Sequence, residues 1–384
     1  MADFGLTDVD QYFSGIRRHK NIILFGCGGK GREAIPILKA HNIKIAAVCD
    51  NNQAMWGRKF LDEYVIQGFD PEIAALEDCC VIITATIVYA AEIQRELQKN
   101  YPQIPIYHLC TPFKVESGLL PESELQARRS ELAEAYSLLC DDESRGIFLD
   151  TLNWKLTGNM LPLNKYPLGY EGYSFFDDTF IHTDEQSVYV DVGAYTGDTI
   201  ACFLMFSRGK FRKIIGVEAD RGNYSALSQM VRFSRVEHIE TYNLGLWSRE
   251  EERVFYTNSA NEKIHFGSPN LFQSVDVVAD NHSMEQMKDK LTENVLQLKT
   301  LDGLLKNEAP TVMKINALAA DREIILGGRH IIAQYKPALM LEFGVTQRDV
   351  FEMIPLLKQI NGGYRFYMRR KRVFEDIKTV LYCV

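Results

Sequence analysis

The chain has 384 residues, of which 46% are hydrophobic and 24% charged, and its formal net charge is -8. This length predicts two domains or one large domain, and the composition is that of a globular protein. Nucleic-acid binding relies on basic contacts to phosphates, so the acidic balance argues against a nucleic-acid partner. Every apolar run is shorter than the ~18 residues that a transmembrane helix needs, and we expect no membrane span.

The first residues, MADFGLTDVDQYFSGIRRHK, lack the apolar core of a secretory signal. The eight cysteines are scattered without a CxxC pair, which is typical of reduced core residues in a cytoplasmic protein. The histidines lack zinc-ligand spacing, and no dense carboxylate cluster indicates magnesium. We therefore expect no metal site.

The first part of the chain alternates apolar runs with helical periodicity. This alternation predicts a parallel, doubly wound sheet, and we place this Rossmann-like domain at residues 1–115. The expected strands are 21–26, 43–49, 80–83 and 104–109, and the expected helices are 30–40 and 89–99.

Residues 116–165 are predicted to be a helical connector. Leucines at 125, 132 and 139 are seven residues apart, but the repeat covers too few heptads for a coiled coil. A connector packed against its neighbours is favoured, and a helix that forms a homodimer is the alternative. Residues 159–183 are rich in Gly, Pro and aromatics, which predicts a loop.

A second alternating region follows, and we place a second domain at 166–384. The fold class is therefore α/β, with two Rossmann-like doubly wound domains joined by the connector. Two final strands are expected to pair antiparallel. The other expected strands are 187–192, 213–218, 237–242, 254–257, 311–315 and 338–343, and the expected helices are 196–207, 221–233 and 321–332.

The first glycine turn, Gly26-x-Gly28-x-x-Gly31, follows a strand and precedes a helix. Asp50 ends the next strand, which completes the dinucleotide fingerprint. The turn and the helix N-terminus would accept a pyrophosphate, and the acid a ribose hydroxyl. NAD or a nucleotide sugar is the predicted ligand. The alternative is a Rossmann-like turn without a ligand, in which Asp50 only opens a solvated loop.

The second turn, Asp191-x-Gly193-x-x-x-Gly197, begins with an acid that would repel a pyrophosphate. S-adenosylmethionine lacks phosphate and carries an ammonium and a sulfonium, so it suits this turn. Glu218 ends the next strand, where a carboxylate can accept both ribose hydroxyls. The alternative is a buried capping Asp and a surface Glu in an empty fold. The remaining residues assigned to this cofactor site are Ala194, Tyr195, Asp198, Thr199 and Ala219.

The second half resembles the FkbM family of S-adenosylmethionine-dependent methyltransferases, including its members with an added N-terminal Rossmann-like domain. The resemblance implies a class I methyltransferase fold and O-methylation of a sugar or another hydroxyl-bearing small molecule. It also implies that Asp220 and Asn223 flank Glu218, and that Asn243 and Leu244 approach the adenine. The motifs that carry it are DESRGIFLDTLNWKLTG, VYVDVGAYTGDTI, IIGVEADRGNYSAL, NLGLWS, LKTLDGLL, PTVMKI and YRFYMRR…TVLYCV.

The sequence departs from the family in KINALAAD, residues 314–321. The family pattern has an Asp and, two residues later, a Glu and a Gly, whereas this chain has Asn316, Leu318 and Ala319. An acid in this turn could hold the methionine end of the cofactor or orient the acceptor. The departure therefore favours, as an alternative function, a non-catalytic binding protein of the same fold.

A sugar hydroxyl needs a positioned general base, and Asn316 cannot be that base. Glu342 ends the apolar strand PALMLEF and is the candidate base, although it could instead pair with a cation such as Arg348. Asn316 is retained as a second catalytic position. His265 and His282 lie in a long irregular stretch, 258–287, which is predicted to cover the pocket for a small-molecule or glycan acceptor.

A third function class is an oxidoreductase or sugar-nucleotide binder that acts through the first domain. The absence of a Tyr-x-x-x-Lys pair there argues against hydride transfer.

Overall fold

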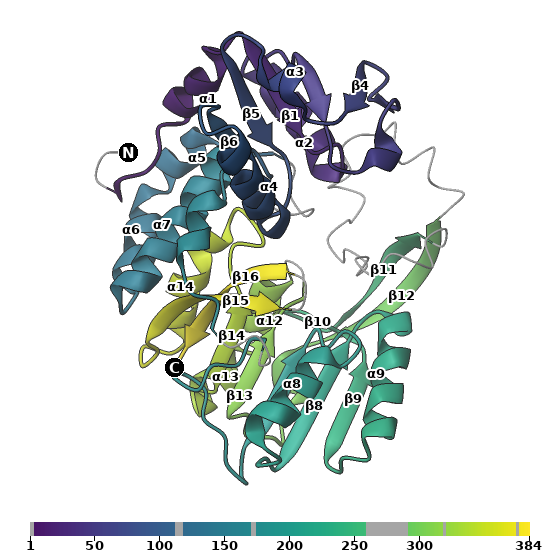
Figure 1. Ribbon diagram of the computed structural model, residues 1–384. Coiled ribbons are helices and arrows are strands. Elements are labelled where there is room, and N and C mark those ends of the chain that lie inside the picture. The colour runs from purple at the N-terminus through teal and green to yellow at the C-terminus, as the bar shows by residue number, and fades with distance from the viewer. Residues whose placement is uncertain (1–3, 112–117, 170–173, 259–290, 318–319, 374–375) are drawn as a thin grey trace. The chain divides into compact units, whose positions relative to one another are not determined.

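The computed structural model describes residues 4–111, 118–169, 174–258, 291–317, 320–373 and 376–384 (Figure 1). The chain divides into two compact units. Unit 1 holds residues 1–136, 141–167 and 375–377, and unit 2 holds residues 137–140, 168–374 and 378–384. None of the described helices is long and apolar enough to cross a membrane. All eight cysteines are free thiols, and all but Cys140 are buried.

Unit 1 contains a six-stranded sheet in the order β3-β4-β2-β1-β5-β6. All neighbouring strands are parallel except β3 and β4, which pair antiparallel. The interior strand β5 is buried along its whole length, as its unbroken apolar run predicts. The strands are β1 (Asn21–Phe25), β2 (Ala47–Cys49), β3 (Lys59–Phe60), β4 (Tyr64–Gln67), β5 (Cys79–Ile83) and β6 (Ile106–His108).

Two helices of unit 1 connect its parallel strands: α2 follows β1, and α4 follows β5. The 116–165 segment forms α5, α6, α7 and the 3₁₀ turn η3. The helices are α1 (Val9–Arg17), α2 (Gly29–Ala40), α3 (Pro71–Ala74), α4 (Ile87–Asn100), α5 (Glu122–Ala127), α6 (Arg129–Ser137) and α7 (Asp142–Thr157), with η2 (Gln53–Met55) and η3 (Leu161–Lys165).

The strand expected at 43–49 is shorter in the structure. The amide of Ile43 donates to Leu38 O at 2.9 Å and so closes the end of α2, which leaves only Ala47–Cys49 for the sheet. Strands β3 and β4 were not predicted. They have two and four residues, which is too short for a clear alternation of apolar and polar side chains.

Unit 2 contains a seven-stranded sheet in the order β15-β16-β14-β13-β7-β8-β9. The neighbouring strands β14, β13, β7, β8 and β9 are parallel, and β16 runs antiparallel to β14. Arg365 and Val384 exchange backbone hydrogen bonds beside β15 and β16, as an antiparallel pair does. The strands are β7 (Val188–Val192), β8 (Lys213–Glu218), β9 (Ile239–Asn243), β13 (Val312–Ile315), β14 (Ala338–Glu342), β15 (Phe366–Val373) and β16 (Asp376–Cys383).

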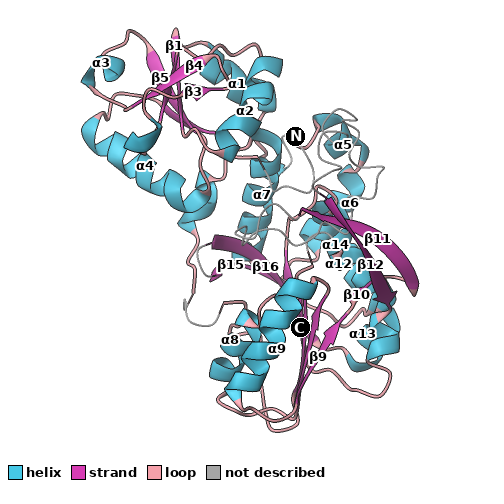
Figure 2. Cartoon of the chain, turned by 90° about the vertical axis from the view of Figure 1, so that its right-hand side faces the viewer, coloured by secondary structure: helices cyan, strands magenta, loops and turns pink. Residues whose placement is uncertain are grey.

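Helices cover both faces of this sheet, with α8 and α9 on one face and α12, α13 and α14 on the other (Figure 2). This arrangement follows from right-handed crossovers. The chain moves along the sheet in one direction from β7 to β8 and in the opposite direction from β13 to β14, so the connecting helices lie on opposite faces. The helices are α8 (Asp198–Ser207), α9 (Arg221–Ser234), α11 (Leu301–Leu304), α12 (Asp321–Gly327), α13 (Arg329–Tyr335) and α14 (Asp349–Ile360).

Unit 2 differs from the predicted elements in two places. The helix expected at 321–332 is broken at Gly328, where an added Cβ would lie 2.5 Å from Leu301 Cδ2. A small second sheet, in the order β10-β12-β11, also contains two unpredicted strands, β10 and β12. Its strands are β10 (Gly245–Leu246), β11 (Glu251–Asn258) and β12 (Leu291–Lys299).

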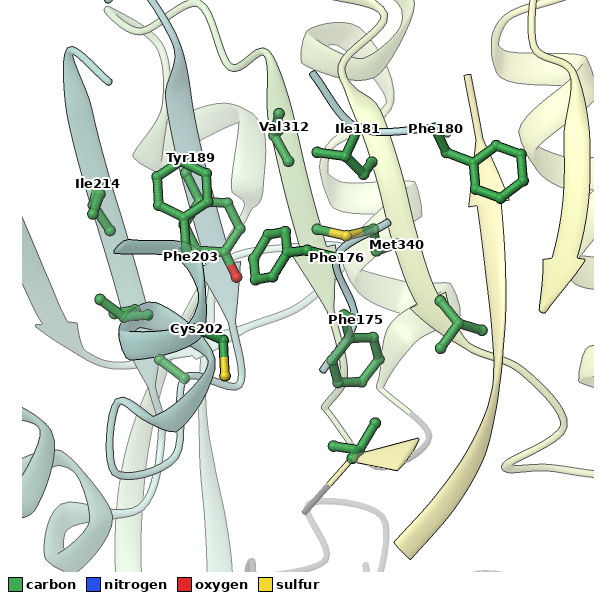
Figure 3. Packing of buried hydrophobic residues seen from close by; sticks show 14 of the residues in the cluster. Phe175, Phe176, Phe180, Ile181, Tyr189, Cys202, Phe203, Ile214, Val312 and Met340 are labelled. Atoms are coloured by element: carbon green, nitrogen blue, oxygen red, sulfur yellow. The ribbon is translucent and has the colours of Figure 1, made fainter. Parts of the chain in front are cut away.

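Aromatic side chains fill the core between β7, α8 and the segment before β7 (Figure 3). Tyr189 stacks on Phe203 with ring centroids 4.3 Å apart, and Phe176 meets Tyr189 edge-on at 5.5 Å. Phe176 belongs to the stretch 159–183 that was predicted as a loop. Its burial ties that loop to the strand that leads into the second glycine turn.

Candidate cofactor site

The second glycine turn connects β7 to α8 at the carboxyl edge of the sheet. Gly193, Tyr195 and Gly197 have φ values of 73°, 50° and 91°, a region that glycine adopts easily and tyrosine rarely. A Cβ on Gly193 would lie only 2.1 Å from the backbone oxygen of Asn316. The turn therefore packs directly against the segment that follows β13.

Asp191 lies under this turn and is fully buried. Its Oδ1 accepts a hydrogen bond from Lys314 Nζ at 3.0 Å, and its Oδ2 accepts one from the hydroxyl of Thr199. Lys314 Nζ also donates to Gly193 O at 2.7 Å. The cation that pairs with Asp191 is therefore Lys314 of the chain itself. The pair holds the turn, because Lys314 also donates to Gly193 O.

Glu218 ends β8 and is only 6% exposed. Its carboxylate accepts hydrogen bonds from the amides of Tyr195 at 2.8 Å and Asp220 at 2.9 Å. No lysine, arginine or histidine of the described chain forms an ion pair with it. Burial raises the pKa of Glu218, and the two amide hydrogen bonds oppose that rise. The end of β8 thereby places a carboxylate against the turn that follows β7.

The residues expected around Glu218 gather there. Asn243 Nδ2 donates to Glu218 O at 2.9 Å and to Ala219 O at 3.1 Å, so this amide fastens the end of β9 to that of β8. Asp220 caps α9 by accepting the amide of Asn223 at 2.8 Å. Leu244 is also buried, as are Ala194 in the turn and Thr199 at the start of α8.

Asp198 is the first residue of α8. Its Oδ1 accepts the amide of Thr199 at 2.7 Å, and it has no ion-pair partner within the described ranges. Burial raises its pKa, while the positive charges of Lys314 and Lys378 lower it.

The segment after β13 contains a buried acceptor that nothing in the described chain satisfies. Asn316 Oδ1 is inaccessible to solvent and has no hydrogen-bond partner, a state that costs about 1–3 kcal/mol. A ligand bearing N–H or O–H groups would satisfy it. The residues present therefore fit a cofactor with a cationic amino-acid end. Leu318 and Ala319 lie outside the described residues.

Asp321 is a buried acid that the sequence analysis did not assign to the site. It begins α12 and accepts the amide of Ala317 at 2.8 Å. Burial raises its pKa from 3.8 to about 7. Residues 314–321 therefore contain a buried carboxyl group. Its hydrogen bond from the amide of Ala317 closes the turn before α12.

Glu342 ends β14, and its carboxylate accepts a hydrogen bond from Lys378 of β16. The cation that pairs with it is therefore Lys378 and not Arg348. The sequence offered no signal for this pair, because the antiparallel pairing of β14 with β16 creates it. The two histidines considered for the acceptor pocket, His265 and His282, lie outside the described residues. Within the described ranges, no three His, Cys, Asp or Glu side chains form a possible metal site.

In the glycine turn of unit 1, as in that of unit 2, a carboxylate at the end of the next strand accepts a backbone amide of the turn. Gly26 has a φ of 115°, and a Cβ on Gly31 would lie 2.2 Å from Gly26 O. The carboxylate of Asp50 accepts the amides of Cys27 and Asn52, each at 2.8 Å, just as Glu218 accepts the amide of Tyr195. No atom of the described residues lies within 4 Å of a Cβ built on Gly28, so this part of the chain leaves the middle of the turn open.

Comparison with known proteins shows what this architecture is similar to. A family model described as C2185-like, N-terminal, matches residues 18–106, which is less than half of the chain. No curated protein matches. The methyltransferase FkbM from Methylobacillus flagellatus KT is 16% identical, with a TM-score of 0.69 over 99% of this chain and 94% of that chain.

Two other methyltransferase structures are similar over about half of the chain. The precorrin-6y C5,15-methyltransferase of Geobacter metallireducens GS-15 is 10% identical, with a TM-score of 0.30 over 53% of this chain and 82% of that chain. An rRNA methylase of Streptococcus thermophilus is 12% identical, with a TM-score of 0.28 over 52% and 88%. The first similarity, to the FkbM structure, shows that the two chains share a fold. The predicted α/β fold with a class I methyltransferase sheet is confirmed.

Proposed function

We propose that this chain is an S-adenosylmethionine-dependent methyltransferase of the FkbM family. The observation that carries the proposal is the position of Glu218, a buried carboxylate that forms no ion pair within the described residues and is held against the glycine turn by the amide of Tyr195. A carboxylate in this place can accept hydrogen bonds from both hydroxyls of a ribose. The fold shared with the FkbM structure supports the assignment.

The residues of the turn would hold the cofactor as follows. Glu218 binds the ribose, Asn243 and Leu244 border the adenine, and the turn itself faces the amino-acid end. When bound, S-adenosylmethionine supplies an electrophilic methyl group on a sulfonium. The chain positions the acceptor oxygen, and positioning supplies much of the rate acceleration in such a displacement.

We propose a hydroxyl of a sugar, nucleotide sugar or similar small molecule as the acceptor. Glu342 would accept the proton of that hydroxyl, and Asn316 would orient it. Lys378 donates a hydrogen bond to one oxygen of Glu342, and the other oxygen would take the proton.

Titration with S-adenosylhomocysteine by calorimetry tests the cofactor assignment. Saturable one-site binding that is lost in Glu218→Ala supports it, and the absence of binding refutes it. If the cofactor binds but no methyl group reaches any member of a panel of sugars and nucleotide sugars, the alternative gains support. That alternative, a binding protein without catalysis, is motivated by the absence of the family's acids at 316 and 318.

The glycine turn of unit 1 keeps its predicted ligand, NAD or a nucleotide sugar, as a proposal. The open space at Gly28 motivates it. Thermal-shift titration with NAD, NADH and nucleotide sugars tests it. Asp50→Ala should abolish any shift in melting temperature, because it removes the carboxylate that accepts the amide of Cys27 in the turn. A melting temperature unchanged by every ligand would contradict the proposal.

A further inference from the structure

The loop that follows β2 in unit 1 holds a tryptophan in a fixed position. The indole of Trp56 donates from Nε1 to the backbone oxygen of Asp50 at 2.7 Å. Its ring also covers Gly68, where an added Cβ would lie 2.6 Å from Trp56 Cζ2. The ring is thus held both by a hydrogen bond at its polar edge and by close packing on a backbone that has no side chain.

Trp56 lies over the carboxyl ends of two neighbouring strands. Asp50 directly follows β2 and Gly68 directly follows β4, and these two strands pair in parallel. Ligands of open α/β sheets bind beyond this edge. Asp50 also connects the ring to the glycine turn, because its carboxylate accepts the amide of Cys27 at 2.8 Å. The indole, the acid and the turn therefore form one continuous set of contacts.

Trp56 differs from the other tryptophans in its exposure. Of the three in the chain, Trp154 and Trp247 are each 7% exposed, whereas Trp56 is 44% exposed. A solitary exposed apolar side chain is ordinary at a protein surface, but this ring is already held in place. A preorganised ring loses little conformational freedom when a second flat group stacks on it. Its exposed part is therefore a preformed platform for an aromatic group of a ligand.

We propose that Trp56 stacks on the base of a ribonucleoside diphosphate whose pyrophosphate lies at the glycine turn of unit 1. This inference rests on the ligand proposed for that turn under the proposed function, and it adds the residue that recognises the base. A carboxylate has about four lone-pair sites, and the amides of Cys27 and Asn52 take two of those of Asp50. Asp50 can therefore still accept a ribose hydroxyl.

The base is attached to that same ribose, and Trp56 is bonded to the backbone of the residue that would bind it. Every nucleobase has an aromatic face, so stacking tolerates different bases. Both NAD and a nucleotide sugar contain a ribonucleoside diphosphate. The platform therefore fits the chemistry that these two sources share.

Calorimetric titration of the full chain with NAD, UDP-glucose and GDP-mannose tests the inference and separates the two sources. Trp56→Leu is expected to weaken whichever nucleotide binds about 5- to 100-fold, because stacking on an aromatic side chain is lost. Trp56→Phe retains a ring and should weaken binding less. Tyr335→Leu removes an aromatic side chain of similar exposure at the end of α13, and it should leave the affinity unchanged.

Tryptophan fluorescence provides a readout that a purely structural role would not change. A base stacked on Trp56 should quench its emission, while the buried Trp154 and Trp247 should contribute a constant background. The quenching should saturate with the same affinity as the calorimetric signal and should be absent in Trp56→Leu. Saturable binding without any quenching would contradict the stacking.

Three further results would overturn the inference. An unchanged nucleotide affinity in Trp56→Leu would place the base elsewhere, although unit 1 would keep its ligand. If that variant instead alters sedimentation of the chain, the exposed indole is a protein contact, to which the exposed Leu61 and Val65 would then belong. A parent chain that binds none of the three nucleotides would remove the ligand of unit 1 itself.

Binding of S-adenosylhomocysteine is a separate measurement, because it tests the methyltransferase assignment of unit 2. Its affinity should be the same in Trp56→Leu and in the parent chain. Failure of the methyltransferase assignment therefore cannot be mistaken for failure of the nucleotide platform.

Discussion

Lys314 and Asp191 form a buried ion pair between neighbouring strands of unit 2. The Nζ of Lys314 lies 3.0 Å from Asp191 Oδ1, and the two side chains are 3% and 0% exposed. The residues stand opposite each other in the register of β13 and β7. Because Lys314 also bonds to Gly193 O, this pair joins the strands and holds the glycine turn.

We expect Lys314→Met to destabilise the chain by about 3–5 kcal/mol, because it leaves the carboxylate of Asp191 buried without a cation. Urea unfolding followed by circular dichroism measures the loss. The double change Lys314→Met with Asp191→Leu should recover much of it, since both charges are then removed. A loss below about 1 kcal/mol in the single variant would contradict the importance of the pair.

Gly193→Ala is expected to destabilise unit 2 and to abolish cofactor binding. The new Cβ would stand 2.1 Å from a backbone oxygen that cannot move like a side chain. Gly209→Ala is the matched control, with a φ of 77° and no atom of the described chain within 4 Å of the new Cβ. The control measures only the backbone strain, about 1–2 kcal/mol. Equal effects of the two changes in urea unfolding would show that the contact with Asn316 is unimportant.

Asp321 should make the chain less stable as the pH rises from about 4 to about 7. Burial raises its folded pKa from 3.8 to about 7, so between these values the unfolded chain has released a proton that the folded chain keeps. The free energy of unfolding then falls with pH by up to a few kcal/mol and becomes constant above pH 7. Asp321→Asn keeps the acceptor for Ala317 and removes the titration. Its unfolding free energy between pH 5 and pH 8 should therefore vary less than that of the parent chain, and an unchanged pH profile would refute the assignment.

Glu342→Gln is expected to lower methyl transfer by about 10²–10⁴-fold while S-adenosylhomocysteine still binds. The amide keeps the shape of the side chain but cannot accept the proton of the hydroxyl. Glu308→Gln is the matched control, because Glu308 also pairs with a lysine, Lys213 at 2.7 Å, but at the start of β8. Single-turnover transfer of a labelled methyl group measures the step, and unchanged transfer in Glu342→Gln would remove it as the base.

Much of the cofactor site could be read from local sequence. The apolar runs of β7 and β8 mark buried parallel strands, since such strands are covered on both faces. Gly193 and Gly197 stand at positive φ, where glycine is the residue that fits without strain. The next strand along the chain then had to bring Glu218 to the same edge. Shorter elements such as β3, and the break at Gly328, carry no comparable local signal.

The charges of the site were decided by the tertiary structure. The partners Lys314 and Asp191 are 123 residues apart, and Lys378 and Glu342 are 36 apart. Each pair meets only because its strands are neighbours in the sheet, an adjacency that residue spacing does not encode. Asp321 and Asn316 likewise have ordinary side chains whose properties change only on burial, because burial is what raises the pKa of the carboxyl group and leaves the amide oxygen without water.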